Sequence, residues 1–323
     1  MKREFMIITE KLGRKWIATQ TKAEKIKNLL LVKGGKEEKV NSPYEIWRIK
    51  LKNVTFTYYR TKTLYATPPK EDPDILLVFQ EIDKIAGSIF VPLKKDFAIG
   101  FDETNKGEAI GPLFLIGLFL PKELFHSLEE IVALIDTKKS HDFSYWEKIY
   151  QKILDFKKAG LTFIGKKIAP QLIDKYKINY LMDIGYLQIL KRLLKEKEVK
   201  NVRIVIDDYG VGKDFKNFLA NLAKAGAEIV IKKDADEKFL EVKIASLIAK
   251  YFKEAFFHKI KNDPKYQIEN LTIGSGNLSD KETKEWLKKW YEKYQKFPYF
   301  VRTSYGPIKK ILGIKENNKK LSH

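Results

Sequence analysis

The first part of the chain combines one helical pattern with alternating strand patterns. Apolar residues recur at helical spacing over residues 21–32, and glycines follow directly. Residues 44–51 and 54–59 alternate apolar and polar side chains as strands do, and a short polar turn separates the second from residues 64–66. These patterns predict a small α+β domain with an antiparallel sheet.

A proline-rich stretch at 68–73 and a helical pattern at 75–86 separate this segment from the rest, so we predict domains at 1–90 and 95–315. In the second domain, short apolar runs alternate with longer helical patterns. The apolar runs are residues 97–101, 113–119, 162–164, 202–206 and 229–231. The helical patterns are residues 122–134, 143–158, 180–195, 213–225, 241–261 and 280–293. This alternation predicts an α/β domain with a mixed central sheet flanked by helices.

The composition limits the kinds of catalytic and metal-binding site that the chain can form. The chain has no cysteine and only four histidines, which excludes disulfides, thiolate zinc sites and cysteine nucleophiles and disfavours a catalytic triad. No apolar run approaches the roughly 18 residues that span a bilayer, and the N-terminal residues lack the apolar region of a secretory signal. We therefore expect a cytoplasmic protein with no membrane partner, and a monomer.

The charge is strongly positive, with 62 Lys and Arg against 42 Asp and Glu and a formal net charge of +20. Residues 1–95 hold 20 of the basic and 11 of the acidic residues, a net of +9, and the other 228 residues hold 42 and 31, a net of +11. The net positive charge per residue is therefore about twice as high in the first segment. Such an excess favours polyanionic partners, of which nucleic acid is the commonest in a cell. The alternative is a surface rich in both lysine and glutamate, as in thermophilic proteins, but such a surface would not explain the excess of positive over negative charge.

Acidic residues follow two of the predicted strands and precede a helix. Asp102 and Glu103 follow the first apolar run, Asp207 and Asp208 follow the fourth, and Asp236 lies just before a helical pattern. Carboxylates placed in this way can converge at one edge of a sheet, where two metal ions roughly 3.5–4 Å apart promote phosphodiester hydrolysis. Mg²⁺ and Mn²⁺ prefer such oxygen ligands and offset the repulsion between them. The alternative is that these three acidic segments are unrelated polar ends of loops.

Several motifs share one order along the chain. Residues 100–112 place Asp102 and Glu103 before the triplet Asn105-Lys106-Gly107. Further motifs lie at residues 136–140, 178–179, 206–207, 236–250, 274–280 and 300–305. Together, over about residues 97–310, they resemble the motifs of the type 2 ribonucleases H, the ribonuclease HII and HIII family. The resemblance implies a ribonuclease H-like fold and metal-dependent hydrolysis of the RNA strand of an RNA/DNA hybrid, leaving a 3′-hydroxyl and a 5′-phosphate.

The resemblance also assigns residues to the site. The family's metal-binding, catalytic carboxylates correspond here to Asp102, Glu103, Asp207 and Asp236, and the expected cofactor is Mg²⁺ or Mn²⁺. Asp208 and Asp234 are the alternatives to Asp207 and Asp236. The triplet, here Asn105, Lys106 and Gly107, reads the ribose 2′-hydroxyl in the family.

Departures from the family pattern favour ribonuclease HIII over HII. Asn105 replaces the first glycine of the triplet, and asparagine adopts positive φ more readily than most residues. Asn277 stands where ribonuclease HII has a tyrosine that stacks on the ribose, and Lys106 with Glu108 resembles the HIII pattern. The basic N-terminal segment is similar to the TATA-binding-protein-like domain of ribonuclease HIII, so residues 1–90 are expected to hold the hybrid.

The hairpin at 54–66 adds candidate substrate-binding residues, because aromatic and basic side chains together suit sugars and phosphates. These candidates are Tyr58, Arg60 and Lys62, beside Tyr59 and Tyr65. The alternative is that the tyrosines form a buried face of the hairpin and the lysines a solvated face. Lys138, Lys139 and Arg302 are further candidates for binding phosphates, or are simply solvated.

The sequence therefore predicts a metal-dependent ribonuclease H with an N-terminal hybrid-binding domain. A non-catalytic nucleic-acid-binding protein on a decayed nuclease fold is the first alternative, motivated by Asn105 and Asn277. A different carboxylate nuclease acting on DNA by the same two-metal chemistry is the second.

Overall fold

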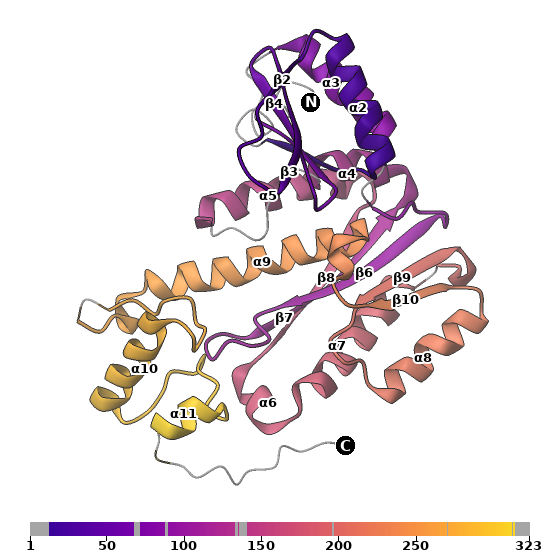
Figure 1. The fold of residues 1–323 in the computed structure, drawn as a ribbon. Helices are drawn as coiled ribbons and strands as arrows, with labels where there is room; N and C mark the ends of the chain where they lie inside the picture. The colour runs from indigo at the N-terminus through magenta and orange to yellow at the C-terminus, as the bar shows by residue number, and fades with distance from the viewer. Residues whose placement is uncertain are drawn as a thin grey trace. The chain divides into compact units, whose positions relative to one another are not determined.

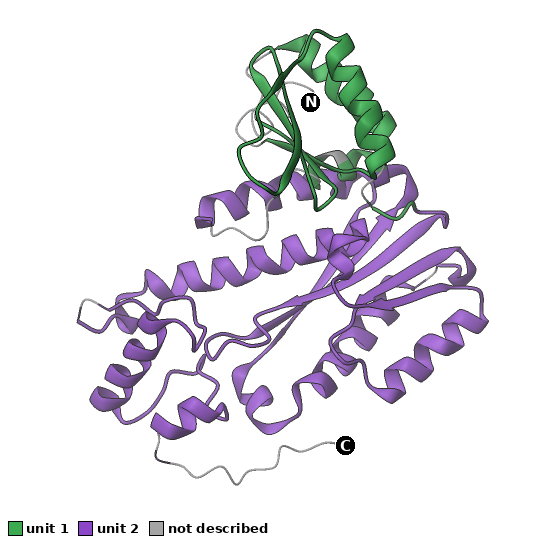
Figure 2. Ribbon diagram, in the orientation of Figure 1, with its two compact units in different colours: residues 1–92, 126–136 green, residues 93–125, 137–323 purple. Residues whose placement is uncertain are grey.

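The computed structural model describes residues 13–67, 72–87, 90–132, 135, 141–195, 197–269, 271–311 and 313, without the side chain of Glu130. The chain divides into two compact units (Figures 1 and 2). Unit 1 comprises residues 1–92 and 126–136, and unit 2 comprises residues 93–125 and 137–323. No helix in the described residues is long and apolar enough to cross a membrane.

Unit 1 contains a five-stranded antiparallel sheet in the order β1-β5-β4-β3-β2. The strands are β1 (Arg14–Ile17), β2 (Lys36–Glu38), β3 (Glu45–Leu51), β4 (Val54–Tyr59) and β5 (Thr63–Ala66), and the helices are α2 (Gln20–Val32), α3 (Pro73–Ala86) and α4 (Phe125–Val132). Apolar side chains of α2 and α3, among them Ile26, Leu30 and Phe79, pack with Trp47 and Phe56 of the sheet. Unit 1 is therefore a two-layer α+β unit with its own core.

Local signals fix the ends of the two long helices of unit 1. Thr19 caps the start of α2 by accepting a hydrogen bond from the Lys22 amide, and the chain leaves α2 through Gly34 at φ 91°. Asp72 caps α3 with Pro73 in its first turn, and Gly87 follows at φ 75°. Caps and glycines of this kind explain why the hydrophobic pattern predicted both helices closely.

Unit 2 is built on a mixed sheet in the order β10-β9-β6-β7-β8. The strands are β6 (Phe97–Thr104), β7 (Leu113–Pro121), β8 (Thr162–Ile168), β9 (Val202–Asp207) and β10 (Glu228–Lys232). β9 and β10 run parallel to β6, whereas β7 and β8 form antiparallel pairs. This mixed sheet flanked by helices confirms the predicted fold class.

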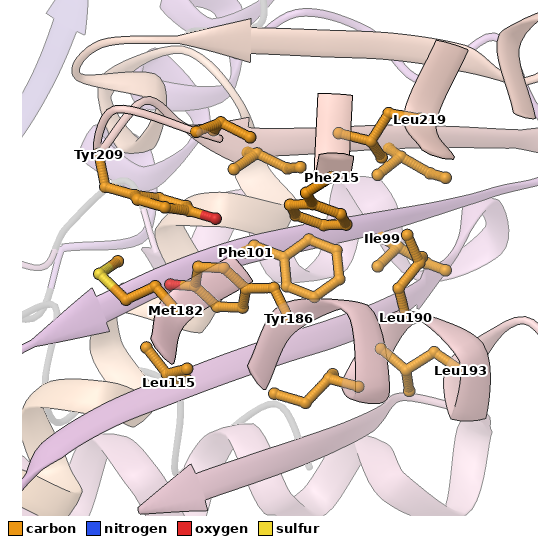
Figure 3. Packing of buried hydrophobic residues seen from close by; sticks show 14 of the residues in the cluster. Ile99, Phe101, Leu115, Met182, Tyr186, Leu190, Leu193, Tyr209, Phe215 and Leu219 are labelled. Atoms are coloured by element: carbon orange, nitrogen blue, oxygen red, sulfur yellow. The ribbon is translucent and has the colours of Figure 1, made fainter. Parts of the chain in front are cut away.

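The helices of unit 2 cover both faces of the sheet and extend beyond its end (Figure 1). The α-helices are α5 (Phe143–Asp155), α6 (Pro170–Lys175), α7 (Ile178–Leu193), α8 (Lys213–Lys224), α9 (Leu240–Lys261), α10 (Lys281–Tyr294) and α11 (Gly306–Ile311). Short 3₁₀ turns are η1 (Lys122–Leu124), η2 (Phe156–Ala159), η3 (Val199–Asn201), η4 (Ala235–Glu237) and η5 (Pro264–Tyr266). α7 and α8 pack on one face, where Phe101, Tyr186 and Phe215 belong to the main core (Figure 3).

Two short strands, β1 and β2, and two short α-helices, α6 and α11, were not predicted from the pattern. Each has six residues or fewer, too few to show a hydrophobic period. β8 is also longer than the predicted 162–164, because its exposed outer residues interrupt the apolar run. Residues 133–134 of the predicted helix at 122–134 lie outside the described chain.

α9 lies against the backbone of β6 at Gly100. A Cβ atom there would lie 2.3 Å from the Glu241 carbonyl carbon and 2.6 Å from the Val242 amide nitrogen. Because both neighbours are backbone atoms, Gly100→Ala should lower the free energy of unfolding by about 1–3 kcal/mol, as overpacking does. Denaturant titration measures this loss. Gly107→Ala is the matched control, since no atom lies within 4 Å of its Cβ position; equal losses for both variants would contradict the close approach.

Candidate active site

The parallel pairing of β6 and β9 brings two predicted carboxylates to one edge of the sheet. Phe101 of β6 pairs with Ile206 of β9, so the next residues along the strands, Asp102 and Asp207, lie at the same edge. The Asp207 carboxylate accepts a hydrogen bond from the Ala235 amide at 3.2 Å. This bond ties the end of β9 to η4, which carries Asp236.

Asp102 and Glu103 have different protein partners. Asp102 accepts a hydrogen bond from the Ser246 hydroxyl on α9, whereas the Tyr186 hydroxyl on α7 donates to Glu103 at 3.2 Å. Adjacent residues of a strand point to opposite faces of the sheet, so helices on both faces hold the pair. Both side chains are largely withdrawn from water, and Asp102 is only 7% exposed.

Burial and mutual repulsion disfavour charge on these carboxylates. Burial, with the Glu103 charge second, raises the pKa of Asp102 well above its usual value. Burial raises the pKa of Glu103 to about 7, although Lys106 and the Tyr186 hydroxyl oppose the shift. Burial also raises the pKa of Asp207, and the charges of Asp236 and Asp234 add to the effect. The structure therefore gathers acidic groups whose ionised forms repel one another.

α9 brings lysines to the same carboxylates. The Lys243 ammonium lies 3.4 Å from the Asp236 carboxylate. Burial lowers the pKa of Lys250, while the nearby charges of Asp236 and Asp102 act in the opposite direction. These lysines supply part of the positive charge that the acidic group needs, and sequence reasoning did not single them out. Lys250 falls in the 236–250 match, but no local pattern indicated its proximity to Asp102.

The oxygen atoms of these carboxylates are chemically suited to bind a divalent cation. Buried carboxylate oxygens are the ligands that Mg²⁺ and Mn²⁺ prefer, and a bound cation would relieve the repulsion that raises their pKa values. Within the described ranges, no group of three or more acidic or histidine side chains is already arranged to hold a metal ion.

The triplet after β6 is held by side chains from within the fold. Asn105 has φ 67°, in line with the expected tolerance for positive φ. Its amide nitrogen donates to the carbonyl oxygens of Ile110 at 2.8 Å and Pro112 at 2.9 Å. The Lys106 ammonium donates to the Tyr209 carbonyl oxygen at 2.9 Å, and open space surrounds the Cβ position of Gly107. The Asn105 and Lys106 side chains thus bond to the protein's own backbone.

Arg302 fits neither of the two sequence-based alternatives, phosphate binding or simple solvation. It is fully buried, and its guanidinium donates to the carbonyl oxygens of Asn105, Lys106 (2.8 Å) and Gly111 (3.1 Å). A planar guanidinium with five donors suits several carbonyls at once. Arg302 therefore fixes the backbone of the triplet, a role that a single arginine far along the sequence does not reveal.

Tyr58 is likewise misplaced by the sequence prediction, because it lies in the core of unit 1. Its ring is 1% exposed and its hydroxyl donates to the Ala18 carbonyl oxygen at 2.9 Å. Tyr59 is half-buried, Lys62 is exposed, and Arg60 donates to the Pro43 carbonyl oxygen at 2.8 Å. The alternation of β4 places Tyr58 on the inner face. Lys138 and Lys139 lie outside the described residues.

Comparison with known proteins identifies the family. The model of the ribonuclease HII family matches residues 99–307. Ribonuclease HII of Pyrococcus abyssi is 31% identical over 216 residues, covering 66% of this chain and 89% of that protein. The crystal structure of ribonuclease H2 from Pyrococcus horikoshii is similar with a TM-score of 0.55 and 27% identity, covering 67% of this chain and 97% of that one.

A second structural likeness extends to the N-terminal unit. Bst-RNase HIII in complex with Mn²⁺ has a TM-score of 0.56 and 15% identity, covering 93% of this chain and 98% of that one. At this identity the likeness concerns the fold alone, and it includes much of unit 1. Because the family model spans more than half of the chain, the chain belongs to the ribonuclease HII family of type 2 ribonucleases H and is an endoribonuclease of the ribonuclease H type.

Proposed function

We propose that this protein hydrolyses the RNA strand of RNA/DNA hybrids internally, leaving a 3′-hydroxyl and a 5′-phosphate, at a two-metal site formed by four carboxylates: Asp102, Glu103, Asp207 and Asp236. The observation that carries the proposal is that segments far apart in sequence bring mutually repelling, partly buried carboxylates to one edge of the sheet. Clustering of this kind is costly without a cation. Divalent ions bound there would activate water and stabilise the leaving oxygen.

The protein's own residues position the carboxylates and the substrate backbone. Ser246 and Tyr186 hold Asp102 and Glu103 from opposite faces of the sheet. Asn105 and Arg302 fix the backbone of the triplet, which is proposed to contact the ribose 2′-hydroxyl. Because a rigid backbone presents donors and acceptors at fixed positions, it can distinguish RNA from DNA by that hydroxyl.

Three duplexes of one sequence test this function: an RNA/DNA hybrid, an all-DNA duplex, and a DNA duplex with one ribonucleotide. With Mg²⁺ or Mn²⁺, the intact protein should cut the hybrid at internal positions of its RNA strand and leave the all-DNA duplex intact. Equal cutting of the all-DNA duplex would contradict recognition of the 2′-hydroxyl and favour a DNA nuclease. Salt-sensitive binding of the hybrid without cleavage in either metal would favour the decayed nuclease.

Unit 1 supplies the proposed hybrid-binding surface, on the sheet face opposite to its core. Lys15, Tyr65 and Arg48 belong to one row across this face, with the buried Thr57 between Tyr65 and Arg48. Arg48 also pairs with Glu38 and Glu45. Lys50 pairs with Lys36 in a second row, and both are exposed. Aromatic and basic side chains in such rows suit the binding of sugars and phosphates. Tyr65, which the sequence analysis named beside Tyr58, is the aromatic residue of this proposed surface, and the buried Tyr58 is not part of it.

Replacing Lys36 and Lys50 together by glutamine should weaken hybrid binding and reduce the slope of log affinity against log salt by about one for each phosphate that the variant no longer binds. Fluorescence anisotropy at several salt concentrations measures both quantities. Lys25→Gln is the matched control, because Lys25 is exposed on helix α2. If the double variant keeps the wild-type affinity and slope, this face does not bind the hybrid.

A further inference from the structure

α7 presents three polar residues on one face beneath the site. Asn179, Asp183 and Tyr186 are spaced by four and three residues, so they lie on the same side of the helix. Tyr186 is fully buried. Most other residues of α7 that enter the main core are apolar, including Met182 and Ile189. Asn179 and Asp183 are half-buried. Polar groups withdrawn from water on a core-facing helix need partners, and these three residues find theirs in the site.

Asp183 and Asn179 bind the segment that follows β9. The Tyr209 hydroxyl donates to Asp183 Oδ1 at 2.6 Å, and the Gly212 amide donates to the same oxygen at 3.2 Å. The Asn179 side-chain amide donates to the carbonyl oxygens of Tyr209 at 3.1 Å and Gly210 at 3.2 Å. Both ends of the 209–212 segment are therefore fastened to α7, immediately after Asp207 and Asp208.

A side chain at residue 212 would displace the Asp183 carboxylate. A Cβ atom on Gly212 would lie 2.2 Å from Asp183 Oδ2. The backbone of Gly212 has φ −73° and ψ 165°, which any residue adopts. The close approach of the Asp183 carboxylate, rather than backbone conformation, thus favours glycine here, because a Cβ atom would push that carboxylate out of its hydrogen bonds.

The triplet and Glu103 join the same assembly. The Lys106 ammonium bonds to the Tyr209 carbonyl oxygen and lies 5.4 Å from the centre of the Tyr209 ring. The rings of Tyr186 and Tyr209 are 5.4 Å apart (Figure 3), and the Tyr186 hydroxyl donates to Glu103. Residues 103 and 106 of one segment and residue 209 of another therefore meet over one face of α7.

We propose that the Asn179-Asp183-Tyr186 face of α7 is a positioning surface that couples the substrate-reading triplet to the segment after Asp207, with Asp183 as its central residue. In this arrangement the Lys106 side chain links the two segments by its hydrogen bond, and the triplet contacts the substrate through its backbone. The inference deepens the proposed function, on which its catalytic consequence rests. The coupling itself is a property of the free protein.

Hydrogen–deuterium exchange of the intact protein without metal tests the coupling. Asp183→Ala removes both hydrogen bonds, and amide exchange should become at least about tenfold faster at residues 209–212 and also at residues 104–108. Asp183→Asn should exchange like the wild type, because its side-chain oxygen can accept both bonds. Gly212→Ala should resemble Asp183→Ala. Unchanged exchange at 104–108 in Asp183→Ala, or an Asp183→Asn variant as fast as Asp183→Ala, would overturn the proposal.

Kinetics then separate positioning from general stability. In Asp183→Ala, kcat on the hybrid should fall about 10–100-fold, as when residues that orient metal ligands are removed, while KM changes less than about twofold and Asp183→Asn restores kcat. An equal loss in both variants, or a loss confined to KM, would contradict the positioning role. If the wild-type protein cleaves no hybrid at all, the proposed function fails while the exchange result still decides the coupling.

Discussion

Asp102→Asn is expected to reduce metal-dependent cleavage of the hybrid by more than about 100-fold. Residues that merely orient metal ligands already contribute about 10–100-fold, and Asp102 is proposed as a ligand itself. Asparagine keeps the size of the side chain and one oxygen acceptor, so the fold should persist. Single-turnover cleavage with Mn²⁺ measures the loss, and circular dichroism checks the fold. Undiminished cleavage would exclude this carboxylate from the site.

Two neighbouring aspartates provide matched controls. Asp234 has φ 53°, a conformation that asparagine tolerates, so Asp234→Asn removes a nearby charge without strain. Asp208 Oδ1 accepts hydrogen bonds from the amides of Gly210 and Val211, and an asparagine oxygen can do the same. Both variants should keep most of the activity. If Asp208→Asn or Asp234→Asn is inactive while Asp207→Asn or Asp236→Asn is active, the assignment has to move to that neighbour.

Arg203→Met is expected to lower the free energy of unfolding by about 3–5 kcal/mol, because it leaves a buried charge without its partner. The Arg203 guanidinium on β9 donates to Glu241 on α9 at 2.8 Å and 3.0 Å, and both side chains are completely buried. The pair joins the strand that ends in Asp207 to the helix that begins just after Asp236. Urea titration followed by circular dichroism measures the change.

The double variant Arg203→Met/Glu241→Leu is the control that separates pairing from packing. Apolar replacement of both members of a buried pair is often neutral or stabilising, so much of the stability should return. Lys288→Ala breaks a solvent-exposed pair with Glu292 and should leave stability nearly unchanged. A double variant as unstable as Arg203→Met would show that the destabilisation comes from packing rather than from the unpaired charge.

The hydrophobic pattern predicted the elements that carry the site because their signals are local. The apolar run before Asp102 and the run before Asp207 are the neighbouring parallel strands β6 and β9, and the pattern at 241–261 is helix α9. The order of the strands was not predictable in the same way. It depends on pairing between residues about a hundred positions apart, for which local periodicity carries no information.

The sequence predicted that Asp102, Asp207 and Asp236 would come together, and the structure brings their segments to one edge of the sheet. The exposure of other candidates depended on tertiary packing that the sequence does not show. Arg302 and Tyr58 were expected at the surface but are buried. A basic or aromatic residue near a motif looks the same in sequence whether it holds a carbonyl or a phosphate. Asp183 and Tyr186 contact the site through hydrogen bonds with Tyr209 and Glu103. These bonds form only because α7 packs against the sheet.

Cleavage of an RNA/DNA hybrid labelled on its RNA strand tests the proposed metal-dependent ribonuclease site. The intact protein is first incubated with the hybrid and a chelator, and Mn²⁺ is then added in excess. We expect no products before the addition and, after it, internal RNA fragments ending in a 3′-hydroxyl, with cleavage by the Asp102→Asn variant reduced more than about 100-fold. Cleavage in the chelator, or no cleavage in either Mn²⁺ or Mg²⁺, would contradict a metal-dependent ribonuclease site at these carboxylates.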